Sequence, residues 1–285
     1  MTPTVRSGLL FFVSVFGAHG LAFATLHRLP DPAVAVLGLG SAQTSARAAF
    51  DEARPNRPYW TVLSDLARGE LGVTLDGTSV RSDLTAASAA SAPRLLGALL
   101  VITLFVGAVA FAHRRILTTL AYGGTLVAFL PPFVVPFAGL GAVLLLDWAG
   151  TGASDLIAIL CLGLPAGALA AAQTAGITRR NLEAPFAITQ RSIGVSLSRQ
   201  RVRLLANLLL ELSPTLEKLF IGLVTALLFV EPIFGQSGLG SLMLRAIRRS
   251  DADMILALVL ATSILINLLR LSGVGIRQAF GAPRL

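Results

Sequence analysis

Charged side chains are scarce in this sequence. They make up 13% of its 285 residues, whereas soluble domains carry about 25%. Hydrophobic residues make up 54% of the chain. A charged side chain at the centre of a bilayer costs at least about 2.5–3.5 kcal/mol, so long stretches without charge are what contact with lipid requires. The composition therefore predicts an integral membrane protein.

The charge that is present is mostly positive, with a formal net charge of +8. In a soluble protein this surplus would suggest nucleic-acid binding. Here most arginines stand at the ends of apolar runs, where positive charge fixes the orientation of a membrane protein. We therefore expect membrane lipid around the chain and no nucleic-acid partner.

Cysteine is nearly absent. Cys161 is the only one, which excludes an intrachain disulfide and a cysteine-based metal site. It lies in an apolar run, as a small buried side chain does. The three histidines are scattered and lack metal-ligand spacing, at positions His19, His27 and His113. We expect no metal site and no cofactor in this chain.

Motifs for catalysis are absent as well. Lys218 is the only lysine, and no G-x-x-x-x-G-K-[ST] surrounds it, so a P-loop for ATP cannot be built. The sequence contains neither H-E-x-x-H nor G-x-S-x-G. We expect no catalytic residue and no enzymatic activity. Energy for transport would have to come from a partner or from an ion gradient.

Six apolar runs reach the length of about 20 residues that a membrane span needs, once tilt and flanks are allowed. They are Gly8–Leu26, Ala92–Ala112, Leu117–Leu146, Leu156–Ile177, Leu216–Val230 and Met254–Ile276. The first could instead be a signal peptide, because Ala22-Phe23-Ala24 resembles a cleavage site. We predict an all-α polytopic membrane protein of about six transmembrane helices, with a small external domain between the first and second spans.

The arginines set the orientation, because positive charge is retained on the cytoplasmic side. Arg6, Arg114-Arg115 and the six arginines between the fourth and fifth spans fall on one side. This predicts a multi-pass protein with both termini cytoplasmic. One external loop, 245–249, is basic and is balanced partly by Asp251 and Asp253. The expected parts are an N-terminal transmembrane helix at 1–27, an extracytoplasmic domain at 28–85 and a five-helix core at 86–285.

A cytoplasmic segment around 181–214 is long for a loop between spans, basic and compatible with helix. Phe186–Ser196 predicts a short helix that stops at Gly194, because glycine adopts a left-handed conformation without steric cost. A second helix is expected to start at Leu197-Ser198, with Ser198 as its N-cap. Such a helix–turn–helix presents one side to a partner. A basic surface helix that only fixes topology fits the spacing equally well.

This segment resembles the coupling loop of the oligopeptide/dipeptide (and nickel) family of ABC-importer permeases, whose pattern is close to Y-V-R-T-A-R-A-K-G-L-S. The matching positions are Phe186, Thr189, Arg191, Gly194 and Ser196. Ile193 stands where the family usually has lysine. In that family the loop docks into a groove on a cytoplasmic ATPase. The resemblance implies that these five residues form an ATPase-coupling loop.

Further fragments match the same family in order along the chain. Arg68–Gly72 is similar to R-G-D-L-G, Leu130–Phe133 to I-P-S-F, and Leu162–Pro165 to L-G-L-P. Residues 230–240 are similar to V-E-T-V-F-S-W-P-G-L-G, which implies an external gate loop near the delivered solute, formed by Glu231, Phe234, Gly238, Gly240 and Asp251. The alternative for this loop is an ordinary re-entrant turn that seals the bundle.

The resemblance, to the first-permease (B) type, implies a function and a set of partners. The chain would be an inner-membrane component of a binding-protein-dependent importer for a peptide-like or related small solute. Its expected partners are a second permease subunit, two cytoplasmic ATPases that bind ATP and magnesium, and an extracytoplasmic substrate-binding protein. The alternatives are a secondary transporter or channel, and a non-transporting membrane scaffold. Few ionisable groups in the spans, such as Arg270, speak against an ion-coupled carrier.

Overall fold

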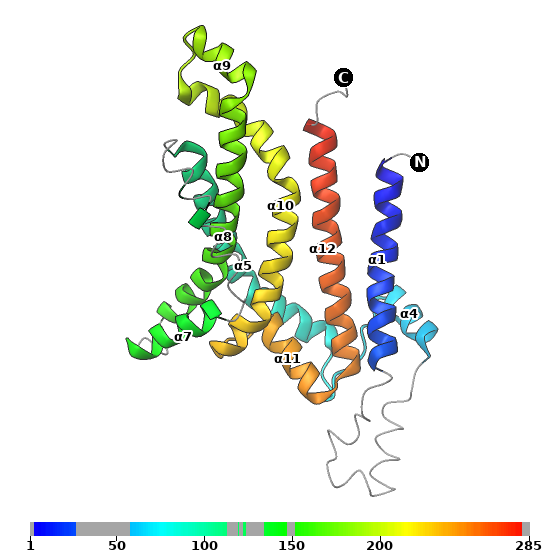
Figure 1. Ribbon diagram of the computed structural model, residues 1–285. Coiled ribbons are helices and arrows are strands. Elements are labelled where there is room, and N and C mark those ends of the chain that lie inside the picture. The colour runs from blue at the N-terminus through cyan, green and yellow to red at the C-terminus, as the bar shows by residue number, and fades with distance from the viewer. Residues whose placement is uncertain are drawn as a thin grey trace, which may run out of the picture. The chain divides into compact units, whose positions relative to one another are not determined.

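The computed structural model describes residues 3–26, 58–112, 134–146 and 152–280, together with the single residues 119, 122 and 123. These parts are almost wholly helical, as Figure 1 shows. Within them, strand-like pairing is limited to one antiparallel bridge between Val73 and Ser79. The predicted all-α fold is confirmed. Residues 28–57 of the expected external domain and 124–133 of the expected third span lie outside the described residues.

Three described helices are long and apolar enough to cross a membrane. They are α1 (Pro3–Leu26), α5 (Val80–Phe111) and α8 (Gly152–Glu183). Shorter apolar helices are α7 (Val134–Leu145) and the 252–268 part of α12 (Ala252–Phe280). Large apolar side chains on these helices are exposed, which suits contact with lipid rather than water. The chain is a polytopic membrane protein.

The remaining helices differ more from what the sequence predicts. α10 (Leu197–Ile233) runs unbroken for 37 residues, or about 55 Å at 1.5 Å per residue, well beyond the expected span of 216–230. It contains Pro214 and Pro232, which neighbouring helices make tolerable. Three short helices complete the described part: α4 (Tyr59–Ala67), α9 (Pro185–Ser192) and α11 (Leu239–Arg249).

The chain divides into two compact units, and α5 and α12 each contribute to both. The first unit comprises 1–90 and 237–268. Its buried cluster joins the first turns of α5 to α11 and α12 and includes Val80, Leu242, Met254 and Leu258. Tyr59 also ties α4 to α1, since its hydroxyl lies 3.3 Å from Nδ1 of His19. Burial raises the pKa of the Tyr59 phenol, which therefore stays protonated.

The second unit comprises 91–236 and 269–285. Its helices pack closely where glycine faces a neighbour. A Cβ at Gly97 of α5 would lie 2.8 Å from the Ile159 side chain of α8, and one at Gly163 of α8 would lie 2.8 Å from Val101. Cys161 is buried in α8, as expected. Close approach through small residues is how helices associate when lipid removes the hydrophobic drive between them.

Four described helices end in the same hydrogen-bonded turn, which α11 closes at Ser250 and three others at a glycine. In each, a residue with positive φ follows the helix, and two backbone N–H groups donate back to its last turn, as in a Schellman motif. The glycines are Gly69 after α4, Gly194 after α9 and Gly235 after α10, with φ of 81°, 83° and 64°. Glycine is favoured here because a side chain disfavours this backbone conformation.

Candidate functional site

The short helix α9 forms the turn between α8 and α10, which are neighbours in the second unit. Figure 1 shows it at the end of that pair. Ala184 is extended, with ψ of 146°, and Pro185 opens the helix at its first position. Proline suits this position because its missing N–H would have no partner there. The helix–turn–helix predicted from sequence is therefore present, and α8 and α10 extend to within a few residues of α9.

The end of α9 depends on Gly194. The Gly194 N–H donates to the Arg191 carbonyl at 3.0 Å, and the Val195 N–H donates to the Gln190 carbonyl at 3.0 Å. A Cβ at Gly194 would have no heavy atom within 4 Å, so space does not restrict this position. The positive φ is therefore the reason for glycine, and the predicted helix stop at this residue is confirmed.

The predicted coupling residues divide into an exposed group and an inward group. Phe186 and Thr189 are exposed, although the Thr189 hydroxyl also donates to the Pro185 carbonyl at 3.1 Å. Arg191 is half-buried, and its guanidinium donates to the Leu182 carbonyl at the end of α8. Arg191 thus fastens α9 to α8, because a cation near a helix C-terminus can bond the last carbonyls.

The N-cap of α10 is Ser196, so the prediction of Ser198 was wrong by two residues. Ser196 has the extended backbone of an N-cap, but its hydroxyl makes no capping hydrogen bond. The backbone of the preceding turn decides the start instead. Once Gly194 and Val195 have closed the end of α9, the chain enters the next helix directly, and Gln200 N–H donates to the Ser196 carbonyl at 3.1 Å.

Glu231, expected in an external loop, lies in the last turn of α10 and is fully buried. The Ser91 hydroxyl donates to its Oε1 at 2.6 Å, and Nη1 of Arg94 lies 3.1 Å from the same oxygen. The loop therefore begins only after Ile233. A buried carboxylate must be paired and hydrogen-bonded, and these partners on α5 supply both needs.

Arg94 is a candidate functional residue that the sequence patterns did not single out. Its Nη2 also lies 3.6 Å from Oδ1 of Asp155 in the first turn of α8, and Nε2 of Gln236 donates to that oxygen at 2.8 Å. We name Ser91, Arg94, Asp155, Glu231 and Gln236 the Arg94 cluster. A charge inside the apolar run 92–112 was the signal that could have found it.

A second ion pair joins α10 to the end of α12. Nε of Arg270 donates to Oε1 of Glu217 at 2.8 Å. Arg270 lies inside the last expected span, and Glu217 lies inside the fifth. These two charges therefore neutralise each other between two helices.

The other predicted gate residues fall in different parts of the chain. Phe234 is the C-cap of α10, and its ring lies 3.3 Å from where a Cβ at Gly139 of α7 would stand. Gly238 is the extended N-cap of α11, and Gly240 is buried in its first turn. Glu231 and Phe234 belong to the second unit, and Gly238, Gly240 and Asp251 to the first.

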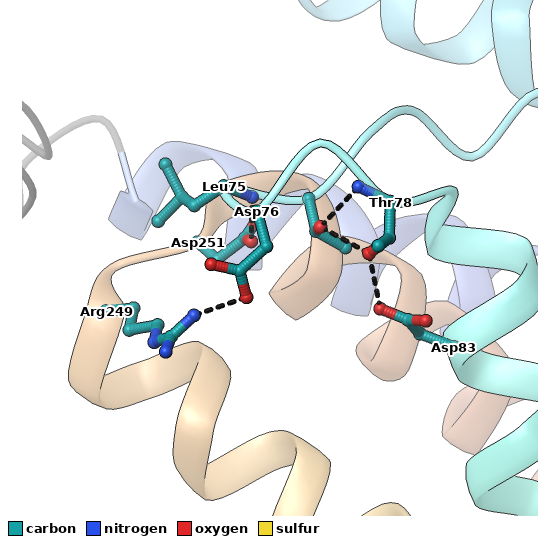
Figure 2. A network of polar contacts seen from close by, with 7 residues as sticks. Leu75, Asp76, Thr78, Asp83, Arg249 and Asp251 are labelled. Carbon is teal, nitrogen blue, oxygen red and sulfur yellow. Dashed lines mark hydrogen bonds and ion pairs between the residues drawn. The ribbon is translucent and has the colours of Figure 1, made fainter.

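Asp251 holds a loop against the start of α12, as Figure 2 shows. Its Oδ2 accepts the Leu75 N–H at 2.7 Å, and its Oδ1 accepts the Met254 N–H at 3.2 Å. The second bond is an N-cap, in which a side-chain oxygen satisfies an otherwise unpaired helix donor. Arg249, from the basic segment 245–249, pairs with Asp76 of the same loop rather than with Asp251. Asp251 thus links the loop at Leu75 to the start of α12 within the first unit.

We expect Asp251→Ala to lower the free energy of unfolding by about 2 kcal/mol, because it removes an N-cap and the acceptor of the Leu75 N–H. Thermal unfolding in detergent measures the change. Asp76→Ala is the matched control, since it breaks only an exposed pair and should cost less than about 1 kcal/mol. Equal losses in the two variants would contradict the role of Asp251.

Among the described residues, no group of three or more histidine, cysteine, aspartate or glutamate side chains is arranged to hold a metal ion. Two sets of side chains in the described residues are candidates for function. One is the exposed face of α9 and the turn at Gly194, and the other is the buried Arg94 cluster. Both belong to the second unit, and α10 contributes to each.

Comparison with known proteins shows a likeness to a transport protein. No protein-family model matches the chain. The chain is 26% identical to the oligopeptide transport system permease protein OppB of Salmonella typhimurium, over 218 residues that cover 71% of this chain and 71% of the relative. The likeness thus extends over most of both proteins and does not rest on a single motif.

Proposed function

We propose that this chain, which is similar to OppB, is a permease of the oligopeptide type of ABC importer and forms half of a path for solute across the membrane. A second, different permease subunit would form the other half. Two cytoplasmic ATPases, holding ATP and magnesium, would power the cycle, and an external binding protein would deliver a peptide-like or related small solute. The chain would lie in a bacterial cytoplasmic membrane with both termini inside.

The observation that carries the proposal is the exposed apolar face of α9. Phe186, Ile188 and Ile193 are 46%, 54% and 74% exposed on an eight-residue helix and its cap. Large apolar side chains exposed on a short helix are available for contact with another protein. The end of α8 beside this helix carries Arg179 and Arg180, and the positive-inside rule favours the cytoplasm for it. A cytoplasmic ATPase with an apolar groove fits this face.

Arg191 and Gly194 serve the geometry of the turn in this proposal. Arg191 bonds the end of α8, and Gly194 closes α9. These residues would aim the exposed face and would not themselves enter the groove. Movement of the docked ATPases would then rotate the helix bundle between two states, the usual form of alternating access.

The two ion pairs favour an importer over an ion-coupled carrier. A carrier of that kind uses intramembrane groups that bind and release protons or cations. Glu231 is held against Arg94, and Glu217 against Arg270. Both carboxylates are thus already engaged by an arginine of a neighbouring helix. The energy source is therefore better sought in a partner.

Site-specific crosslinking tests the docking face. Ile193→Cys, modified with a photoactivatable thiol reagent, should crosslink to a nucleotide-binding subunit in native membranes. Leu104→Cys is the matched control, because Leu104 of α5 is 62% exposed but belongs to a membrane span, and it should give no such product. The native Cys161 is buried and gives little background. A product of equal yield from Leu104→Cys, or none from Ile193→Cys, would contradict the proposal.

A further inference from the structure

The attachment of α9 to its neighbours raises a mechanical question. Extended backbone at Ala184 precedes the helix, and Gly194 with φ of 83° follows it. Both positions can act as hinges, because a few residues at the ends of an element absorb most of the change in φ and ψ. An eight-residue helix between two hinges would swing on its own unless side chains fix it. A force applied to its exposed face would then not reach the long helices.

Gln200 supplies such a fixation. It lies in the first turn of α10 and is fully buried. Its Nε2 donates to the Ala187 carbonyl in α9 at 3.4 Å and to the Val195 carbonyl after the Gly194 turn at 3.3 Å. Ala187 is itself fully buried, so this is the face of α9 that packs inward. The side-chain amide of Gln200 therefore bonds the chain on both sides of the C-terminal hinge of α9.

The chemistry of the amide agrees with this assignment. Both neighbours are carbonyl oxygens, and only the NH₂ end of a glutamine can donate to them. Its Oε1 is buried and has no hydrogen-bond partner among the described residues. Leaving a buried acceptor unpaired is unfavourable, so the two donated bonds are what holds this side chain inside.

The helix that carries Gln200 also reaches the Arg94 cluster. α10 continues without a break from Gln200 to Glu231, a rise of about 47 Å at 1.5 Å per residue. Glu231 is fixed to Ser91 and Arg94 of α5. A displacement of α9 that moves Gln200 therefore acts on one end of a helix whose other end holds a buried ion pair.

We infer that Gln200 is a positioning residue that makes α9 and α10 move as one body. Through it, the displacement of the docked turn would reach the C-terminal end of α10, where Glu231 pairs with Arg94 of α5. The mechanical step rests on the proposed function, since the displacement comes from the ATPase. The rigid attachment of α9 does not.

Hydrogen exchange on the full chain in lipid nanodiscs tests the attachment. Gln200→Glu keeps the shape of the side chain but removes both donors, since a carboxylate only accepts. Amides of α9 and the Gly194 turn should then exchange about tenfold faster. Gln190→Glu is the matched control and should leave exchange unchanged, because its side chain makes no hydrogen bond to the described residues. Gln200→Leu serves if the glutamate variant does not fold. Unchanged exchange in both Gln200 variants would overturn the inference.

The assembled importer in proteoliposomes tests the mechanical role. Gln200→Glu should keep basal ATP hydrolysis but lower the solute transported per ATP by about tenfold, within the range of coupling between sites. A merely structural role would reduce transport and hydrolysis together, and an unchanged ratio would overturn the inference. Failure of the wild-type chain to assemble with an ATPase would instead reject the proposed function, and the exchange experiment would still decide the attachment.

Discussion

Replacing Arg94 with methionine is expected to lower the free energy of unfolding by about 3–5 kcal/mol, because it leaves a buried carboxylate without its counter-charge. Glu231 is fully buried, and Arg94 is only 12% exposed. Water therefore cannot take the place of the lost guanidinium. The Ser91 hydroxyl would remain on Oε1, but a neutral donor does not balance a full charge.

The double variant separates charge from packing. Arg94→Met with Glu231→Met removes both charges and should recover most of the stability, because a buried ion pair replaced by apolar side chains of similar volume is often neutral or stabilising. Thermal unfolding of the purified chain in detergent measures both effects. Arg249→Met is the control, since its pair with Asp76 is exposed and is worth less than about 1 kcal/mol. Wild-type stability in Arg94→Met would show that the ion pair between Arg94 and Glu231 does not stabilise the fold by this amount.

Gly194→Val is expected to abolish solute uptake while membrane insertion stays normal. Gly194 has φ of 83°, and an L residue in left-handed conformation costs roughly 1–2 kcal/mol, more for a β-branched one. No atom would clash with the new side chain at Cβ. The turn would therefore change its backbone path, and the exposed face of α9 would point away from its partner.

Gly69→Val is the matched control for this variant. Gly69 ends α4 in the same motif with φ of 81°, and a Cβ there also meets no atom within 4 Å. Both variants should lose similar stability, but only Gly194→Val should lose co-purification with the ATPase subunits. Gly194→Asn should retain part of it, because asparagine tolerates the left-handed region. Full uptake by Gly194→Val would remove the basis for a coupling role of this turn.

Features governed by local chemistry could be predicted from the sequence. The apolar runs gave the membrane helices, because hydrocarbon excludes charge over a length set by the bilayer. Gly194 marked the end of α9, because the left-handed region favours glycine in any context. The start of α10 was missed because several residues can cap a helix, and the preceding turn selected Ser196 instead of Ser198.

Features that join distant segments could not be predicted in this way. Glu231 and Arg94 are far apart in sequence, and only the packing of α10 on α5 makes them partners. The bond from Leu75 to Asp251 likewise depends on tertiary structure. Gln200 resembles any polar residue of an early helical turn, and its role follows from the two carbonyls that face it. Single-sequence patterns carry no information on such contacts.

A pull-down of the tagged full chain from its native membrane in mild detergent, with mass spectrometry of the recovered proteins, tests the proposed function most directly. We expect recovery of two nucleotide-binding subunits, of one or two kinds, together with a second permease chain. Recovery should depend on the exposed face of α9 and fall in Gly194→Val. Recovery of the chain alone, or only with copies of itself, would contradict the importer and favour a carrier or a scaffold.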